Sequence, residues 1–286
     1  MQFASVLMGS EEVAVLVDKA RGVVPIRDIS PRDDGDLLAV IGSGELDRIV
    51  AEAEAAPDTS FANVEGVTFV APYRHPRMLW GIGLNYVAHA ADLEAAVPEE
   101  PASFIKGDHT VIGPGEDITI PVQSVRTTAE AELGVVIGRY CRNVEPEDAL
   151  SYLLGVCPVL DQTAEDILEL NPRFLTRSKN FPGFFSFGPR IVPLDEAIAV
   201  AGSLANVTVS TVVNGTEFRT NTISNMRFDP AYLISFHSKV MPLYPGDIIS
   251  TGTPGAIHIR AGDVAECWIA GVGVLTNPVV APSVSQ

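Results

Sequence analysis

Two acidic residues spaced two apart, Glu130 and Glu132, are the first candidates for chemistry in this sequence. They lie within residues 127–138, where apolar side chains alternate over 131–137, a pattern that predicts a β-strand. Residues i and i+2 of a strand point to the same side, so both carboxylates project from the face opposite the apolar one. Two adjacent carboxylates repel each other, and a bound cation is the usual relief.

Asp161 is the third acidic candidate, because it ends another apolar run at 155–161. A carboxylate at the end of such a strand is well placed to be a further oxygen ligand. Three carboxylates without His or Cys suit a hard cation such as Mg²⁺ or Mn²⁺ and do not suit Zn²⁺ or Cu²⁺. A solvated Glu-x-Glu edge and an unrelated loop Asp have the same spacing, so the residues alone leave both interpretations open.

His89 and Asp92 form a second possible constellation. A short helical turn over 85–94 would place them on one side at i and i+3. A carboxylate beside an imidazole fixes its tautomer and raises its basicity, which suits a general base that activates water. Glu94 is an alternative partner for the imidazole, and a surface His beside a helical Asp is the alternative to a catalytic pair.

Composition favours a soluble enzyme. The chain has 286 residues, which is long enough to bury a large core. Of these residues 47% are apolar and 19% are charged, which excludes wholesale disorder. The formal charge of −17 argues against nucleic acid and anionic membrane surfaces, which attract basic proteins. An acidic protein can still bind a small anion where a metal and a few lysines reverse the local charge.

The cysteines and the N-terminus predict a cytoplasmic location. Cys141, Cys157 and Cys267 are an odd number without Cys-x-x-Cys spacing, which fits reduced thiols. The first residues lack a basic leader, so no signal peptide is expected. No run approaches the ~20 apolar residues of a membrane helix.

The order of elements predicts a small N-terminal α/β region at 1–72 and a larger catalytic domain at 73–286. In the first part, 13–17 and 22–26 resemble two strands around a turn. Residues 44–53 have helical spacing of their apolar side chains.

The remainder is expected to be rich in strands, so the fold class is α+β with β-structure dominant. Residues 207–213 followed by Asn214-Gly215 predict a hairpin, because Asn-Gly accepts the positive φ angles of a tight turn. A further turn precedes a strand at 248–251, and the clearest helix is 145–154. Gly81-x-Gly83 lacks the third glycine of a dinucleotide-binding loop, which argues against such a site.

Four blocks of residues, in this order, resemble the fumarylacetoacetate hydrolase (FAH) superfamily from about Pro72 onward. They are Gly81-Ile82-Gly83-Leu84-Asn85-Tyr86-Val87-Ala88-His89, Phe104-Ile105-Lys106, Glu130-Ala131-Glu132-Leu133, and Pro245-Gly246-Asp247-Ile248-Ile249-Ser250-Thr251-Gly252-Thr253-Pro254. The resemblance implies a large mixed β-roll core. It also implies a divalent-metal enzyme acting on small oxo acids or diketones, usually by cleaving a carbon–carbon bond.

The resemblance also implies roles for individual residues. The implied metal ligands are Glu130, Glu132 and Asp161; the implied catalytic residues are His89, Asp92 and Lys179; and the implied substrate-binding residues are Tyr86, Lys106 and Thr253. Asp92 stands where the family usually has Glu, so the arm that orients His89 is shorter.

The segment after Asp161 departs from the family pattern. Glu165 occupies the place of an Arg, Leu168 the place of a Gln, and Pro182 a place where Asp is common. An Arg would pair with a substrate carboxylate as a planar fork, whereas Glu would repel it. We therefore expect a less charged or bulkier substrate than a simple acylpyruvate.

The expected function is a hydrolase of a 1,3-dicarbonyl or 2-oxo compound, using one Mg²⁺ or Mn²⁺ per chain and acting in catabolism. Tautomerisation or decarboxylation of a 2-oxo acid is the alternative within the enzyme class, since both need the same stabilised enolate. A non-catalytic, metal-dependent binding module is the alternative of another class. The family is commonly dimeric, so a homodimer is expected.

Overall fold

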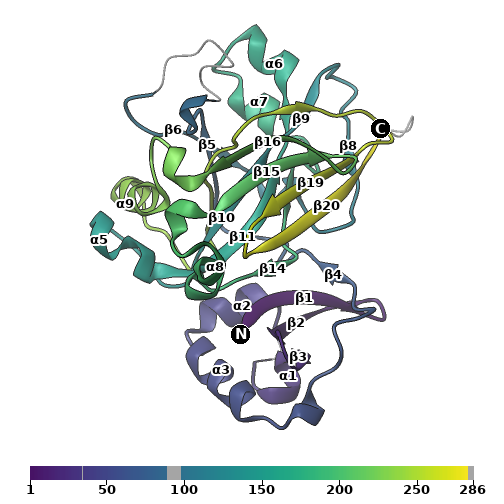
Figure 1. The fold of residues 1–286 in the computed structure, drawn as a ribbon, viewed down its shortest axis with the longest axis vertical. Helices are drawn as coiled ribbons and strands as arrows, with labels where there is room; N and C mark the ends of the chain where they lie inside the picture. Colours follow the sequence, from purple (N-terminus) through teal and green to yellow (C-terminus); the bar gives the residue numbers. More distant parts are fainter. Residues whose placement is uncertain (34, 89–97, 283–286) are drawn as a thin grey trace.

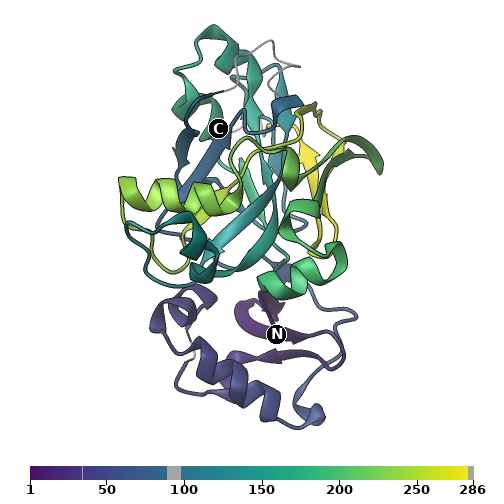
Figure 2. The same cartoon turned by 60° about the vertical axis from the view of Figure 1, so that its left-hand side comes forward.

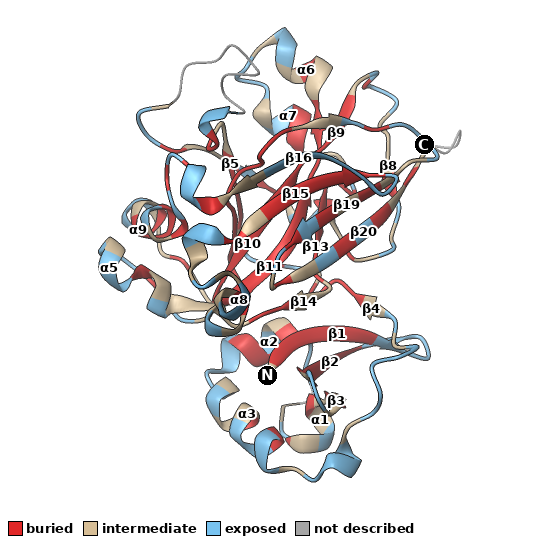
Figure 3. Ribbon diagram, viewed as in Figure 1, coloured by how far each residue is buried: buried red, intermediate tan, exposed pale blue. Residues whose placement is uncertain are grey.

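The computed structural model describes residues 1–33, 35–88 and 98–282. A small N-terminal layer lies at one end of a larger β-rich body, and the second view shows the same arrangement (Figures 1 and 2). The two longest sheets of the body share an apolar core that includes Leu133, Val135, Val209 and Leu275. Buried residues follow the strands of this body, and most exposed residues lie in loops and helices (Figure 3).

The N-terminal layer is a sheet covered by short helices. Its strands run in the order β14-β1-β2-β3, with β4 also paired to β1. The bounds are β1 (Gln2–Met8), β2 (Glu11–Asp18), β3 (Gly22–Pro25), β4 (Phe69–Val70), β14 (Arg190–Ile191), α1 (Ile26–Ile29), α2 (Leu37–Ser43) and α3 (Leu46–Ala55). The strand pair predicted at 13–17 and 22–26 and the helix predicted at 44–53 are confirmed as β2, β3 and α3.

The N-terminal layer shares both a strand and a core with the rest of the chain. β14 comes from far along the sequence and pairs with β1. Leu16 and Ile41 pack in one cluster with Phe187 and Ile248. The division predicted at Pro72 stays a prediction.

The central sheet is mixed and has the order β6-β5-β17-β10-β11-β13-β7. Its strands are β5 (Leu79–Gly83), β6 (Ala102–Lys106), β7 (Val111–Ile112), β10 (Ala131–Ile137), β11 (Leu153–Asp161), β13 (Phe185–Phe187) and β17 (Ile248–Ser250). β17 pairs with β5 and β13 with β7 in parallel, whereas β10 and β11 are antiparallel. β10 is buried along its whole length, as expected for a strand at the centre of a covered sheet.

Two further sheets complete the body. The strands are β8 (Ile118–Thr119), β15 (Thr208–Val213), β16 (Thr216–Thr222), β19 (Val264–Ile269) and β20 (Gly273–Val280) in one, and β9 (Thr127–Ala129), β12 (Thr163–Ala164) and β18 (Ile257–His258) in the other. β15 and β16 form the predicted hairpin, with Asn214 at φ 52° and Gly215 at φ 71°. The β-rich fold with a mixed β-roll core is confirmed.

The remaining α-helices within the described ranges are short and lie around the sheets. They are α5 (Pro146–Ala149), α6 (Glu165–Leu170), α7 (Leu175–Lys179), α8 (Leu194–Ala201) and α9 (Pro230–Val240). The helix predicted at 145–154 was too long. α5 ends at Ala149, a 3₁₀ turn follows, and Leu153 already pairs with Ile137 in the central sheet. No helix in the described ranges is long and apolar enough to cross a membrane.

Candidate metal centre

The pairing of β10 with β11 brings the three predicted carboxylates together. Glu130 lies between β9 and β10, Glu132 lies in β10, and Asp161 is the last residue of β11. The Asp161 amide donates to the Glu130 carbonyl at 2.9 Å, which fixes the end of one strand against the start of the other. One oxygen from each carboxylate lies within 4.8 Å of the other two, and all three side chains are buried. The predicted convergence of these residues is therefore present.

Glu130 has one oxygen fixed by hydroxyl groups and the other facing an ammonium. Its Oε1 accepts from Thr128 Oγ1 at 2.9 Å and from Thr163 Oγ1 at 2.5 Å. Its Oε2 accepts from Lys179 Nζ at 3.0 Å. The threonines hold the carboxylate in one orientation, because each donates to the same oxygen.

Glu132 is held in a similar way from the other side. Its Oε2 accepts from Ser250 Oγ at 2.6 Å and from the Gly252 amide at 2.7 Å. Gly252 has φ +103°, and a Cβ there would lie 2.8 Å from Cβ of Asn85, so this position requires glycine. Burial raises the pKa of Glu132 to about 8, and the nearby Asp161 charge adds to the rise. The positive charge near this carboxylate, that of Lys179, is therefore too small to offset burial and the Asp161 charge.

Asp161 lies between two buried lysines. Lys106 Nζ donates to its Oδ1 and to the Phe184 carbonyl at 2.6 Å, and Lys179 Nζ donates to its Oδ2 at 2.9 Å. Burial favours a higher pKa for Asp161, but the two ammonium groups outweigh it and lower the pKa. Burial lowers the pKa of Lys106 to about 8, although the Asp161 charge opposes this.

The donor set fits a hard divalent cation. Its members are carboxylates only, and hydrogen bonds from neighbouring side chains or a backbone amide orient each of them, as such donors commonly orient metal ligands. Three carboxylates face two lysines, so the formal charge of the cluster is negative without a cation. Glu130, Glu132 and Asp161 are therefore the candidate ligands of a metal site.

A cavity of about 460 Å³ opens onto this cluster, at the end of the molecule that carries α6 and α7 (Figure 1). Glu130, Glu132, Lys179 and Thr253 supply polar groups to its lining. The predicted positions of Lys179 and Thr253 beside substrate are thus compatible with the structure. The volume is that of a site for a small organic molecule.

Two residues predicted to bind substrate do not line this cavity. Lys106 points instead toward Asp161 and the carbonyl oxygens of Gln162 and Phe184, and it is buried. Tyr86 is fully buried, and its hydroxyl has no hydrogen-bond partner among the described residues. Burial, together with the charge of Glu132, raises the pKa of Tyr86.

The predicted base lies in a part of the chain that the structure does not describe. His89, Asp92 and Glu94 all fall within residues 89–97, outside the described ranges. β5, which precedes them in the sequence, ends at the cavity, where Gly83 and Leu84 contribute to the lining.

Sequence reasoning missed Arg126, which lies beside the cavity residue Glu165. Arg126 Nε lies 2.7 Å from Glu165 Oε2, and its Nη2 contacts Glu169 Oε1. Glu165 and Glu169 both line the cavity. Burial raises the pKa of Glu165, although Arg126 opposes the rise. Arg126 and Glu165 are far apart in sequence, so no local pattern could reveal the pair.

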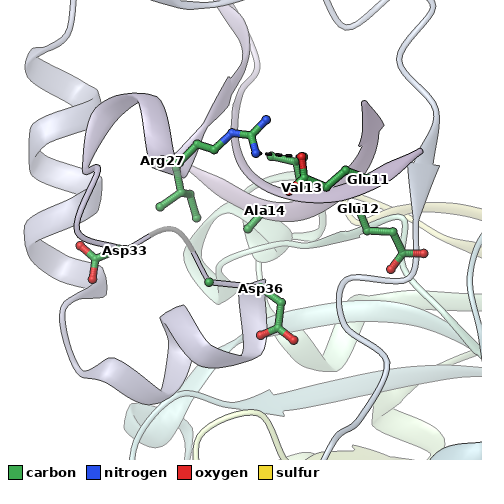
Figure 4. Close-up of a pocket in the computed structure, with 9 residues that line it drawn as sticks. Glu11, Glu12, Val13, Ala14, Arg27, Asp33 and Asp36 are labelled. Carbon is green, nitrogen blue, oxygen red and sulfur yellow. Dashed lines mark hydrogen bonds and ion pairs between the residues drawn. The ribbon is translucent and has the colours of Figure 1, made fainter. Parts of the chain in front are cut away.

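A second, smaller pocket of about 130 Å³ lies in the N-terminal layer (Figure 4). Its charged groups are engaged in structural contacts. Arg27 Nη1 lies 2.9 Å from Glu11 Oε2, and Asp36 accepts from the Ala39 amide at the start of α2. Asp33 accepts from an Arg48 nitrogen at 2.7 Å. These acidic groups do not converge as the buried carboxylates of the body do.

Comparison with known proteins places this fold in a family of enzymes that act on small molecules. A family model described as fumarylacetoacetate (FAA) hydrolase C-terminal matches residues 78–280. The chain therefore belongs to the fumarylacetoacetate hydrolase superfamily, as its motifs predicted.

Three relatives show the range of reactions in this superfamily. Mitochondrial oxaloacetate tautomerase Fahd2a of Rattus norvegicus is 30% identical over 267 residues, which are 91% of this chain and 84% of the relative. The structure of fumarylacetoacetate hydrolase from Exiguobacterium antarcticum has TM-score 0.82 and 28% identity, covering 99% of this chain and 100% of the other. That of 5-carboxymethyl-2-hydroxymuconate delta-isomerase from Mycobacterium smegmatis has TM-score 0.75 and 27% identity, with the same coverage. Hydrolases, isomerases and tautomerases thus share this fold.

Proposed function

We propose that the protein is a divalent-metal-dependent hydrolase that cleaves a carbon–carbon bond in a small 1,3-dicarbonyl or 2-oxo compound. The observation that carries this proposal is the convergence of Glu130, Glu132 and Asp161 beside a cavity that Glu130, Glu132 and Lys179 line. A buried cluster of carboxylates needs compensating positive charge, and a site of this size suits a small organic substrate.

Mg²⁺ or Mn²⁺ is the proposed ion, one per chain, since the ligand set contains only carboxylate oxygens. When bound, such an ion polarises carbonyl oxygens and stabilises negative charge that develops on them. Thr128, Thr163, Ser250 and Gly252 would keep the ligand carboxylates in place by the hydrogen bonds described above.

The residues of the chain have distinct parts in the proposed reaction. His89, oriented by Asp92, takes a proton from a water molecule, and the resulting hydroxide adds to one carbonyl carbon. The carbon–carbon bond then breaks, its electron pair remains on the enolate of the departing ketone, and that carbon takes up a proton. Lys179 places a positive charge beside the reacting oxygens, and Thr253 contacts the substrate.

Tautomerisation or decarboxylation through the same enolate is the second candidate, and the likeness to an oxaloacetate tautomerase and to an isomerase favours it. A screen of 2-oxo acids and diketones with Mg²⁺ and Mn²⁺, with and without chelator, tests for enzyme activity. Turnover in H₂¹⁸O then separates the reactions, since hydrolysis incorporates ¹⁸O into the new carboxylate and tautomerisation does not. Metal binding without turnover of any compound in the screen would favour a binding module.

The same proposal includes a cytoplasmic homodimer that acts in catabolism. All three cysteines are buried and unpaired, which is compatible with a reducing compartment. The homodimer is proposed because the superfamily, to which the chain belongs, is commonly dimeric. Gel filtration with light scattering tests the oligomeric state, and a mass equal to one chain would contradict it.

A further inference from the structure

The wall of the cavity beyond the carboxylate cluster is largely apolar. Leu84, which follows β5, and Phe104 of β6 contribute to it, as do Leu168 of α6 and Leu175 of α7. Leu168 occupies the place where the superfamily pattern has a polar Gln. Burying an alkyl or aryl group against such a wall is favourable, because apolar surface leaves water. The apolar side chains offer no hydrogen-bond donor to a carboxylate.

The charged residues in this part of the cavity are acidic. Glu165 and Glu169 lie one turn apart on α6, so both face the same side of that helix. Arg126 lies between them and contacts a carboxylate oxygen of each. Its guanidinium is therefore engaged by two carboxylates, and the three side chains together keep a net negative charge.

The balance of charge in the lining disfavours a second anionic group on the substrate. Four carboxylates line the cavity, those of Glu130, Glu132, Glu165 and Glu169, and among the described lining residues Lys179 is the only cation. Lys179 is already bonded to Glu130 and Asp161. A cation held by the metal ligands would attract oxygens at that end of the substrate, but it leaves the net negative charge of Glu165, Glu169 and Arg126 in place.

We propose that the substrate is a 1,3-diketone with two uncharged ends, one of them an alkyl or aryl group, and that Glu165 and Glu169 exclude a carboxylate by holding Arg126 between them. This inference rests on the proposed function. It identifies the class of substrate, whereas the relatives' names refer to anionic oxo acids. Arg126 acts as a positioning residue that keeps the two glutamates at the cavity wall.

The experiment compares two ligands that differ at one end: an alkyl-substituted 1,3-diketone with a terminal methyl group, and the acylpyruvate in which a carboxylate replaces that methyl. We measure kcat/KM and, by calorimetry on the Mn²⁺-loaded protein, the affinity for each compound. Wild type should favour the diketone by about tenfold or more in both quantities. In Glu165→Arg, the new arginine supplies a bidentate donor to the carboxylate, so kcat/KM and affinity for the acylpyruvate should rise by about tenfold to hundredfold.

Two further variants control for misfolding and for the change in net charge. Glu165→Gln removes the same charge with little change in size, so it should shift the preference in the same direction if Glu165→Arg does not fold. Glu147→Arg makes the same charge change at an exposed site on α5, away from α6 (Figure 1), and should leave the ratio unchanged. A shift as large in Glu147→Arg would attribute the effect to net charge and overturn the proposal.

The outcomes separate this inference from the proposed function. A wild-type preference for the acylpyruvate, lost in Arg126→Met, would show that Arg126 leaves the glutamates to bind the carboxylate, and would overturn the inference. An unchanged ratio in both Glu165 variants would also overturn it. Absence of turnover with a clear preference in binding would contradict the hydrolase proposal alone.

Discussion

The Lys179 ammonium lies 2.9 Å from Oδ2 of Asp161, and both side chains are almost fully buried. Burial alone would lower the pKa of Lys179, but the charges of Asp161, Glu130 and Glu132 outweigh it and raise the pKa. The lysine is therefore charged, and it stabilises the carboxylates of Glu130 and Asp161. The same charge lies beside the cavity, where it can stabilise an enolate.

The first prediction concerns the general base. His89→Ala should lower turnover by about two to four orders of magnitude while metal binding persists, because a positioned base contributes that much. Asp92→Asn should cause a smaller loss, since Asp92 orients the imidazole and does not itself accept the proton. Steady-state kinetics on the true substrate, with calorimetry of Mn²⁺ binding, checks both effects. Near-normal turnover in His89→Ala would show that His89 and Asp92 are not catalytic.

The second prediction concerns Lys106, which donates to Asp161 and does not line the cavity. Lys106→Met keeps the length of the side chain but leaves Asp161 Oδ1 without its donor, whereas the Phe184 carbonyl keeps the Gln162 amide as a donor. Breaking a buried ion pair costs about 3–5 kcal/mol, so the free energy of unfolding in urea should fall by that order. Lys239→Met is the control, because the Lys239–Glu145 pair is exposed and should contribute at most about 1 kcal/mol. Equal losses of stability in the two variants would contradict a stabilising role of the buried Lys106–Asp161 pair.

The third prediction concerns the pH dependence of stability. Burial raises the pKa of Asp247 to about 6 from its ordinary 3.8, so the folded state binds this proton more tightly than the unfolded state. The contribution of Asp247 to stability is thus greatest below pH 4 and is lost as pH rises through 6. Asp247→Asn should remove this pH dependence and can still accept from the Tyr244 amide.

Urea unfolding between pH 4 and pH 7 tests this prediction. The difference in free energy of unfolding between variant and wild type should grow with pH, by up to about 3 kcal/mol for a shift of about two pKa units. Taking the difference cancels the titration of other groups. A difference that stays constant with pH would show that Asp247 titrates alike in both states.

Local sequence patterns correctly predicted features that depend on residues close together in the chain. The i, i+2 spacing placed Glu130 and Glu132 together, and Asn214-Gly215 identified the β15–β16 hairpin. In contrast, the helix predicted at 145–154 was shortened by strand pairing of Leu153 with Ile137, a contact between distant segments that outweighs helical periodicity.

The direction of long side chains could not be predicted for the same reason. The Phe-x-Lys block identified Lys106, but its orientation depends on Asp161 and the Phe184 carbonyl, which only the folded sheet brings close. The Arg126–Glu165 pair likewise joins segments that β9 and β12 bring together. Register between strands decides such contacts, and no single stretch of sequence encodes it.

Titration of metal-free protein with Mn²⁺ in a calorimeter tests the central claim, that Glu130, Glu132 and Asp161 hold a divalent cation. Wild type should bind one ion per chain. Each of Glu130→Ala, Glu132→Ala and Asp161→Ala should weaken binding by about tenfold or more, a loss of at least about 1.4 kcal/mol, with an unchanged circular dichroism spectrum. Affinity equal to that of wild type in all three variants would contradict the assignment of the site.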